Sequence, residues 1–86
     1  MPKIVFLGAG STVFAKNLLS DILSFEALSD ATIALHDIDE ARLATTHRVG
    51  RRIAEAMGVQ PRLETHLDRK TALEGADYVI GMFQVG

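Results

Sequence analysis

The sequence predicts an α/β domain of the Rossmann type, with a parallel sheet in the strand order 3-2-1-4 and helices on both faces. Short apolar runs alternate with longer stretches whose apolar residues recur at helical spacing. The first apolar run ends in a glycine-rich turn that leads directly into a helical pattern. An acidic residue stands at the end of the second apolar run, as in dinucleotide-binding domains.

The first half of the chain predicts a strand, a helix and a second strand. Residues 4–7 form a continuous apolar run that Gly8 ends, which is typical of a central strand covered on both faces. A helix is expected from Thr12 to about Leu28. Its apolar stripe consists of Val13, Phe14, Leu18, Leu19, Ile22, Leu23 and Phe25. Residues 32–36 give the second strand, which should pair with the first.

The second helix has a start signal and a stop signal. Asp39 stands where an N-cap belongs, and Gly58 follows the last residue of the helical pattern. The apolar face between them consists of Leu43, Val49, Gly50, Ile53 and Met57. We interpret the many arginines of this segment as a solvated face.

The remaining elements are a polar strand, a short helix and a fourth strand. Residues 61–66 are largely polar, with apolar and polar side chains in alternation. Pro61 has no N–H to donate to a neighbouring strand, so this strand belongs at an edge of the sheet. Residues 71–74 predict a short helix that Gly75 ends. The segment from Tyr78 to Gly86 reads as a buried strand running into a loop. We therefore expect residues 1–86 to be the N-terminal part of a larger, truncated NAD-binding Rossmann domain.

The composition excludes several classes of protein. The chain has 86 residues, 48% of them hydrophobic and 23% charged, with a net charge of -2, so it lacks the basic surface of a nucleic-acid-binding protein. It contains no cysteine, which excludes disulfides and thiolate metal sites built from this chain. No apolar run is long enough for a signal peptide or a membrane span. We expect a cytoplasmic protein without nucleic-acid or membrane partners.

The turn "GAGSTV" is the first candidate site. Gly8 and Gly10 match two positions of the G-x-G-x-x-G pattern, and Val13 occupies the third. In this pattern the first glycine allows a tight turn, the second lets the backbone approach a pyrophosphate, and the third permits close helix packing. We expect Val13 to displace or tilt the helix slightly. Ser11 and Thr12 add hydroxyls at the helix N-terminus, where N–H groups and the helix dipole attract anions.

Asp37 is the second part of the candidate site. The ends of the first two strands are neighbours in this architecture, so the Asp37 carboxylate should face a ribose bound across the turn. Its two oxygens suit the 2′- and 3′-hydroxyls, and each charge-assisted hydrogen bond is worth about 1.5–3 kcal/mol. The same charge would repel a 2′-phosphate, which favours NAD over NADP. Two glycines alone would also fit a plain strand-to-helix turn, and Asp37 is what favours a dinucleotide.

Other combinations of polar residues are weaker candidates for a catalytic or metal site. Asp37 and Asp39 resemble a paired-carboxylate site, but a ribose ligand followed by a helix cap explains both. His36, His47 and His66 lack the spacing of metal ligands. We assign no catalytic residue and no metal ligand within this sequence.

Three segments of the sequence also resemble a known protein family. The segments "KIVFLGAGSTVFAKNLLSDIL", "IALHDIDEARL" and "ALEGADYVIGMFQVG" together resemble the N-terminus of glycoside hydrolase family 4. The helix pattern "FxKNxLxDxL" together with "FQVG" looks most like the α-galactosidase (melibiase) branch of that family. The resemblance covers nearly the whole chain and is more specific than the glycine pattern alone.

The resemblance implies a glycosidase that uses NAD and a divalent metal, typically manganese, rather than two carboxylates. In the family's scheme, hydride leaves C3 of the sugar for NAD, and a base then removes the C2 proton. The glycosidic oxygen leaves by elimination, water adds at C1, and the hydride returns to C3. The metal ligands and the catalytic tyrosine lie farther along a longer chain, so we expect this segment alone to be inactive.

Position by position, the resemblance implies a set of cofactor-binding residues: Gly8, Gly10, Ser11 and Thr12 at the pyrophosphate, Asp37 at the adenosine ribose, and Gln84 and Gly86 in the loop after the fourth strand. The partners that it implies for the parent protein are a small-molecule glycoside and further copies of itself in a homo-oligomer.

Three alternatives fit parts of the same pattern. The chain could be the NAD-binding segment of a 2-hydroxy-acid dehydrogenase of the lactate or malate type. It could also be a non-catalytic nucleotide-sensing module, which should bind NAD at micromolar levels, whereas a half-domain should bind it poorly or not at all. A methyltransferase that uses S-adenosylmethionine ranks last, because the hydroxyls at the helix start suit phosphates that this cofactor lacks.

Overall fold

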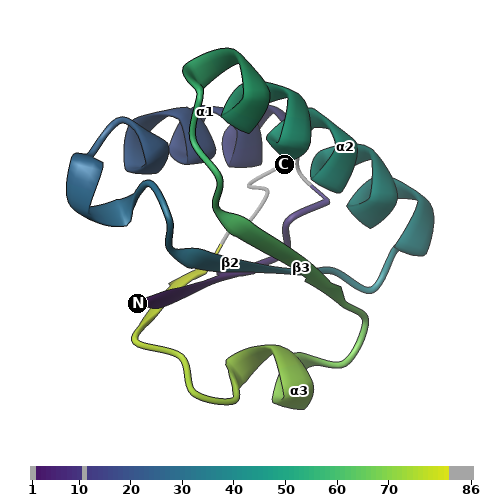
Figure 1. Ribbon diagram of the computed structural model, residues 1–86. Coiled ribbons are helices and arrows are strands. Elements are labelled where there is room, and N and C mark those ends of the chain that lie inside the picture. Colours follow the sequence, from purple (N-terminus) through teal and green to yellow (C-terminus); the bar gives the residue numbers. More distant parts are fainter. Residues whose placement is uncertain (1, 11, 82–86) are drawn as a thin grey trace.

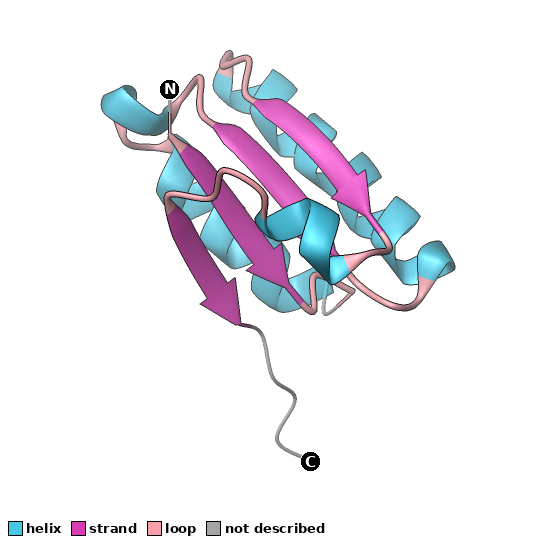
Figure 2. Cartoon of the chain, turned by 90° about the horizontal axis from the view of Figure 1, so that it is seen from below, coloured by secondary structure: helices cyan, strands magenta, loops and turns pink. Residues whose placement is uncertain are grey.

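The computed structural model describes residues 2–10 and 12–81 and shows a four-stranded parallel sheet. Its order, β3-β2-β1-β4, confirms the predicted topology. The strands are β1 (Lys3–Leu7), β2 (Thr32–His36), β3 (Arg62–His66) and β4 (Tyr78–Gly81). Because all four run in one direction, their carboxyl ends meet at one edge of the sheet, which Figure 2 shows from below.

Helices cover both faces of the sheet, as predicted. The two long helices, α1 (Thr12–Leu23) and α2 (Glu40–Met57), lie on one face, and the short α3 (Arg69–Leu73) lies on the other (Figure 1). Right-handed crossovers explain this division, because the chain moves outward from β1 to β3 and then returns across the sheet to β4. In the part of the chain that the structure describes, no helix is long and apolar enough to cross a membrane.

The hydrophobic core is divided by the sheet into a large and a small cluster. The large cluster joins the sheet to α1 and α2, and its fully buried members include Phe6, Leu19 and Leu35. The small cluster under α3 centres on Val5, Ala34 and Ala72. Since β1 and β2 contribute to both clusters, the two central strands are covered on both faces, as their apolar runs predict.

The first helix ends earlier than the sequence pattern predicts. α1 stops at Leu23, and a separate 3₁₀ turn, η1 (Glu26–Leu28), follows it. The Ser24 hydroxyl donates to the carbonyl of Asp21 at 2.6 Å, and the Phe25 amide donates to the carbonyl of Ile22, three residues back. These contacts tighten the last turn and take up carbonyls that a longer helix would use.

The apolar stripe predicted for this helix is partly wrong. Val13, Phe14 and Phe25 are 74%, 60% and 62% exposed, so they do not contribute to the core. Leu19 and Leu23 are buried as predicted, and Ala15, which was not predicted, is buried with them. Val13 therefore does not stand between the helix and the sheet, and the predicted displacement of the helix by Val13 has no basis in the packing.

The other elements follow the prediction with small differences. Asp39 caps α2 by accepting from the Arg42 amide, and Gly58 ends the helix in the left-handed region at φ 70°. α3 begins at Arg69, two residues before the predicted start, because Asp68 accepts from both the amide and the hydroxyl of Thr71.

β4 differs from its prediction as a buried strand. Tyr78 is 61% exposed and Val79 is 50% exposed, while Ile80 packs against the large cluster. Within the described residues β4 pairs with β1 alone, so it is an edge strand. The apolar side chains that predicted a buried strand are present, but the described residues do not cover Tyr78 and Val79.

We predict that Gly50 is required for the close contact of α2 with α1 and β3. A Cβ atom at Gly50 would lie 3.2 Å from Leu19 Cδ1 and 3.3 Å from Leu63 Cδ1. Gly50→Leu should therefore overpack this contact and lower the free energy of unfolding by about 1–3 kcal/mol. The control is Ala56→Leu on the exposed face of α2, which should change the free energy of unfolding by less than about 0.5 kcal/mol. Thermal denaturation measures both variants. Equal stability of the two variants would contradict this packing.

Candidate functional site

The glycine turn after β1 is fastened to the end of β2. Gly8 has φ 83°, a conformation that glycine adopts without strain. The amides of Gly8 and Ala9 both donate to the carbonyl of His36, at 2.9 and 2.8 Å. The positive φ turns the chain sharply enough for two successive amides to reach one carbonyl, so the turn has a defined shape.

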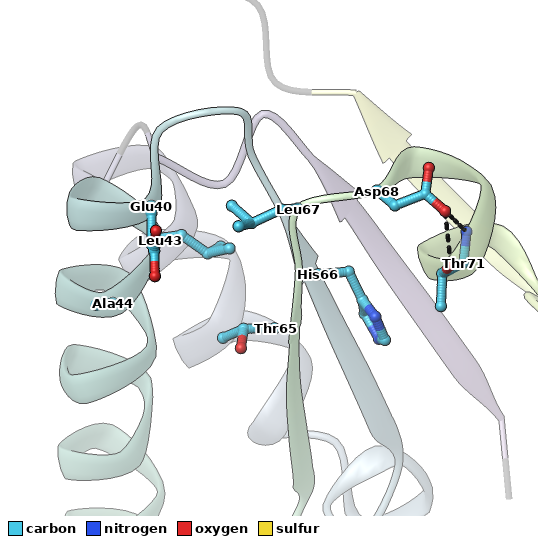
Figure 3. A pocket seen from close by; sticks show the side chains of 8 residues that line it. All are labelled: Glu40, Leu43, Ala44, Thr65, His66, Leu67, Asp68 and Thr71. Atoms are coloured by element: carbon cyan, nitrogen blue, oxygen red, sulfur yellow. Dashed lines mark hydrogen bonds between the residues drawn. The ribbon is translucent and has the colours of Figure 1, made fainter.

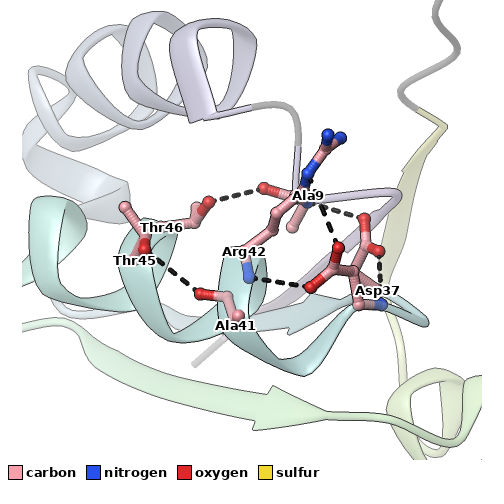
Figure 4. A network of polar contacts seen from close by, with 8 residues as sticks. Ala9, Asp37, Ala41, Arg42, Thr45 and Thr46 are labelled. Carbon is pink, nitrogen blue, oxygen red and sulfur yellow. Dashed lines mark hydrogen bonds and ion pairs between the residues drawn. The ribbon is translucent and has the colours of Figure 1, made fainter.

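The Asp37 carboxylate points toward this turn, as the sequence predicts. Its Oδ2 accepts from the Gly10 amide at 2.7 Å, and its Oδ1 accepts from the Asp39 amide at 2.8 Å (Figure 4). Each oxygen of a carboxylate has about two acceptor sites, so one hydrogen bond on each leaves capacity for a further donor. The two backbone contacts fix the orientation of the carboxylate beside the turn, and Asp37 is partly exposed.

Gly10 has a structural role that sequence reasoning did not supply. A Cβ atom at this position would lie 2.6 Å from Asp37 Oδ2 and 3.1 Å from the Cβ atom of Arg42. A side chain would therefore push the carboxylate and the first turn of α2 away from the glycine turn. The close approach that requires glycine here is an approach within the protein, in addition to any approach of a ligand.

Thr46 is a member of the site that sequence reasoning missed. It lies on the buried face of α2 with only 1% of its surface exposed, and its hydroxyl donates to the carbonyl of Ala9 at 2.8 Å. Figure 4 shows this contact on the opposite side of the turn from Asp37. The available signal was a polar residue three positions after Leu43 and four before Gly50, on the face that packs against the core.

The backbone amides of residues 8–10 all donate to acceptors within the protein. Gly8 and Ala9 donate to His36, and Gly10 donates to Asp37. The remaining candidate donors are the amides at the start of α1, because the first N–H groups of a helix have no acceptor within it. Of the predicted site residues, Ser11, Gln84 and Gly86 and the Thr12 side chain lie outside the described residues, so their roles stay predictions.

A hollow lies at the same edge of the sheet as the glycine turn, on the side of β3. It has a volume of about 520 Å³ and lies between α2, the end of β3 and the start of α3 (Figure 3). Glu40 and Asp68 line it, and none of the lysines and arginines that the structure describes does. The hydroxyl and the amide of Thr71 donate to Asp68 and lower the pKa of that carboxyl. This acidic lining makes the hollow a poor site for a pyrophosphate.

The histidines do not form a metal site in the described part of the chain. His66 Nε2 lies 3.1 Å from a carboxylate oxygen of Glu64, and His36 is buried in the sheet. Among residues 2–10 and 12–81, no group of three or more histidine, aspartate and glutamate side chains could hold a metal ion.

Comparison with known proteins gives one family. Residues 3–86 match the model of the family described as "Family 4 glycosyl hydrolase". The chain is 44% identical over 86 residues to an α-galactosidase of Bacillus subtilis (strain 168), covering 100% of this chain and 20% of the relative. It is 44% identical over 84 residues to an α-galactosidase of Rhizobium meliloti (strain 1021), covering 98% of this chain and 17% of the relative.

A relative with a different name is similar over nearly the same stretch of the chain. An α-glucosidase of Erwinia rhapontici is 38% identical over 84 residues, covering 98% of this chain and 18% of the relative. The chain thus spans about a fifth of the length of the curated relatives that it matches. The match extends over both the glycine turn and the end of β2, where the geometry places the candidate site. The chain therefore belongs to glycoside hydrolase family 4.

Proposed function

We propose that this chain is the NAD-binding segment of a glycosidase similar to the α-galactosidases of its family. The observation that carries the proposal is the Asp37 carboxylate, held against the Gly10 amide at the carboxyl end of β2. In open α/β sheets this edge is where ligands bind, and an acid at the end of the second strand binds the ribose of adenosine.

The residues present fit the adenosine half of NAD. Asp37 would accept from the 2′- and 3′-hydroxyls of the ribose, using the acceptor capacity that its two backbone contacts leave. The first amides of α1, beginning near Thr12, would donate to the phosphates, and the positive end of the helix dipole would favour their charge. The negative charge of Asp37, beside that of Asp39, disfavours a 2′-phosphate and so favours NAD over NADP.

The remainder of the proposal concerns the parent protein. When bound, NAD supplies a hydride acceptor for the sugar, which is the chemistry that the family resemblance implies. We propose that the parent hydrolyses small O-glycosides by redox, elimination and addition steps with a divalent metal such as manganese. The ligands of that metal are proposed to lie in the part of the parent beyond this chain. The role of the present residues is to bind and orient the adenosine half of the cofactor.

We predict weak but saturable binding of ADP by the unaltered chain, with a dissociation constant on the order of 0.1–1 mM, since ADP fills only half of a dinucleotide site. Asp37→Asn should weaken it more than tenfold, because one charge-assisted hydrogen bond to a ribose hydroxyl is worth about 1.5–3 kcal/mol. Ligand-observed NMR titration measures both constants. The control is Asp30→Asn, an exposed acid in the turn before β2.

Two results would contradict the cofactor proposal. One is the absence of saturable ADP binding by the unaltered chain. The other is an equal effect of the Asp37 and Asp30 substitutions. Thermal denaturation of each variant without ligand shows whether a loss of binding comes from unfolding instead.

We also predict that Thr46 stabilises the turn that carries the site. Thr46→Val keeps the shape of the side chain but removes the donor to the buried Ala9 carbonyl, which should cost about 1–3 kcal/mol in urea denaturation. Thr45→Val is the matched control, since the Thr45 hydroxyl donates to Ala41 within the same exposed turn of α2. It should cost less than about 0.5 kcal/mol. A Thr46 variant as stable as the Thr45 variant would show that the turn does not depend on this contact.

A further inference from the structure

Arg42 lies in the first turn of α2, three residues after the helix cap. Its amide donates to Oδ1 of Asp39 at 3.1 Å, and its Nε lies 3.5 Å from Oδ2 of the same carboxylate. The Arg42 side chain is 65% exposed. An exposed ion pair of this length holds a guanidinium loosely, so the side chain is able to exchange partners.

The charge of Arg42 is unfavourable for the helix that carries it. The N-terminal turn of a helix favours negative side chains, because the helix dipole places partial positive charge there. In a capping box, the third residue after the cap is glutamate or glutamine, which bonds back to the cap. An arginine in this position conflicts with both local rules, and such conflicts are expected at functional sites.

The backbone of Arg42 lies against the glycine turn. Its Cβ atom is 3.1 Å from the position that a Cβ atom of Gly10 would take. Figure 4 shows the side chain rising from α2 beside Asp37 and past Ala9. Arg42 therefore brings a positive charge to the point where the ribose and the phosphates of a bound dinucleotide would meet.

Acidic side chains precede Arg42 in the sequence. Asp37, Asp39 and Glu40 place three carboxylates at the end of β2 and the start of α2. A dinucleotide adds two negative phosphate groups, and a positive charge close to them would offset their repulsion by these acids. A guanidinium suits this task because its planar donors match phosphate oxygens in pairs.

We propose that Arg42 binds the adenosine-side phosphate of the dinucleotide, exchanging its contact with Asp39 for one with the phosphate. This inference rests on the proposed cofactor function and adds a binding residue that the glycine pattern does not contain. It divides the adenosine half between two side chains of opposite charge: Asp37 acts on the ribose and Arg42 acts on the phosphate.

The test compares ADP with adenosine, which has the same base and ribose but no phosphate. Arg42→Gln should weaken ADP binding about tenfold or more, the value of one hydrogen bond to a charged group, and should leave adenosine binding unchanged. It should also reduce the salt dependence of ADP binding, because one ionic contact is lost. Arg42→Lys should retain part of the affinity. The matched control is Arg48→Gln, another exposed arginine of α2, which should bind ADP like the unaltered chain.

The outcomes separate this inference from the proposed function. Unchanged ADP binding by the Arg42→Gln variant, with Asp37→Asn still weakened, would overturn the role of Arg42 and leave the cofactor proposal standing. An equal loss of adenosine and ADP binding would also overturn it, because Arg42 would then act on the base or on the turn itself. Failure of the unaltered chain to bind ADP at all would overturn both.

Discussion

The hydrogen bond from the Gly10 amide to the Asp37 carboxylate is the contact on which the organisation of this site depends. It joins the turn after β1 to the residue after β2 at 2.7 Å, and it requires the absence of a side chain at Gly10. With the two amides that reach the His36 carbonyl, it makes one rigid unit from two strand ends. A carboxylate held in this way is oriented before any ligand arrives, which reduces the entropic cost of binding.

α2 and its N-cap residue also contact Asp37 and the glycine turn. Asp39 caps the helix and also donates its amide to Asp37, so the start of α2 and the orientation of the carboxylate are fixed by one loop. About two turns farther along, Thr46 holds the carbonyl of Ala9 from the buried face of the same helix. Gly50 then allows α2 to pack closely enough on α1 and β3 for these contacts to form. The glycine turn is thus the meeting point of β1, β2 and α2, and it precedes the helix whose first amides face the same edge.

The sequence was sufficient for the features that depend on local pattern. Apolar runs located the central strands, Asp39 and Gly58 located the limits of α2, and the crossover rule placed α3 on the opposite face. Asp37 could be found because an acid at a strand end has a recognised position relative to a glycine turn. The sequence could not show that Gly10 makes room for Asp37, because that contact spans 27 residues of chain.

Other features depended on contacts between elements or on competing local bonds. Thr46 was missed because its role depends on how closely α2 approaches the turn, which no periodicity reports. The early end of α1 followed from the Ser24 hydroxyl, which competes for a helix carbonyl inside an otherwise regular apolar pattern. The exposure of Tyr78 and Val79 depends on what lies beside β4, and an apolar pattern alone does not describe its neighbours.

The most direct test of the central claim is to map ADP-ribose binding on the amide resonances of the chain. Within the described residues, Asp37 accepts from the amides of Gly10 and Asp39, and both amides report on its surroundings. If the carboxylate binds the ribose, these two resonances should shift most and should follow one saturation curve. If they stay fixed while the amides of Leu67 and Thr71 around the acidic hollow shift instead, Asp37 is not the ribose ligand and the site lies elsewhere.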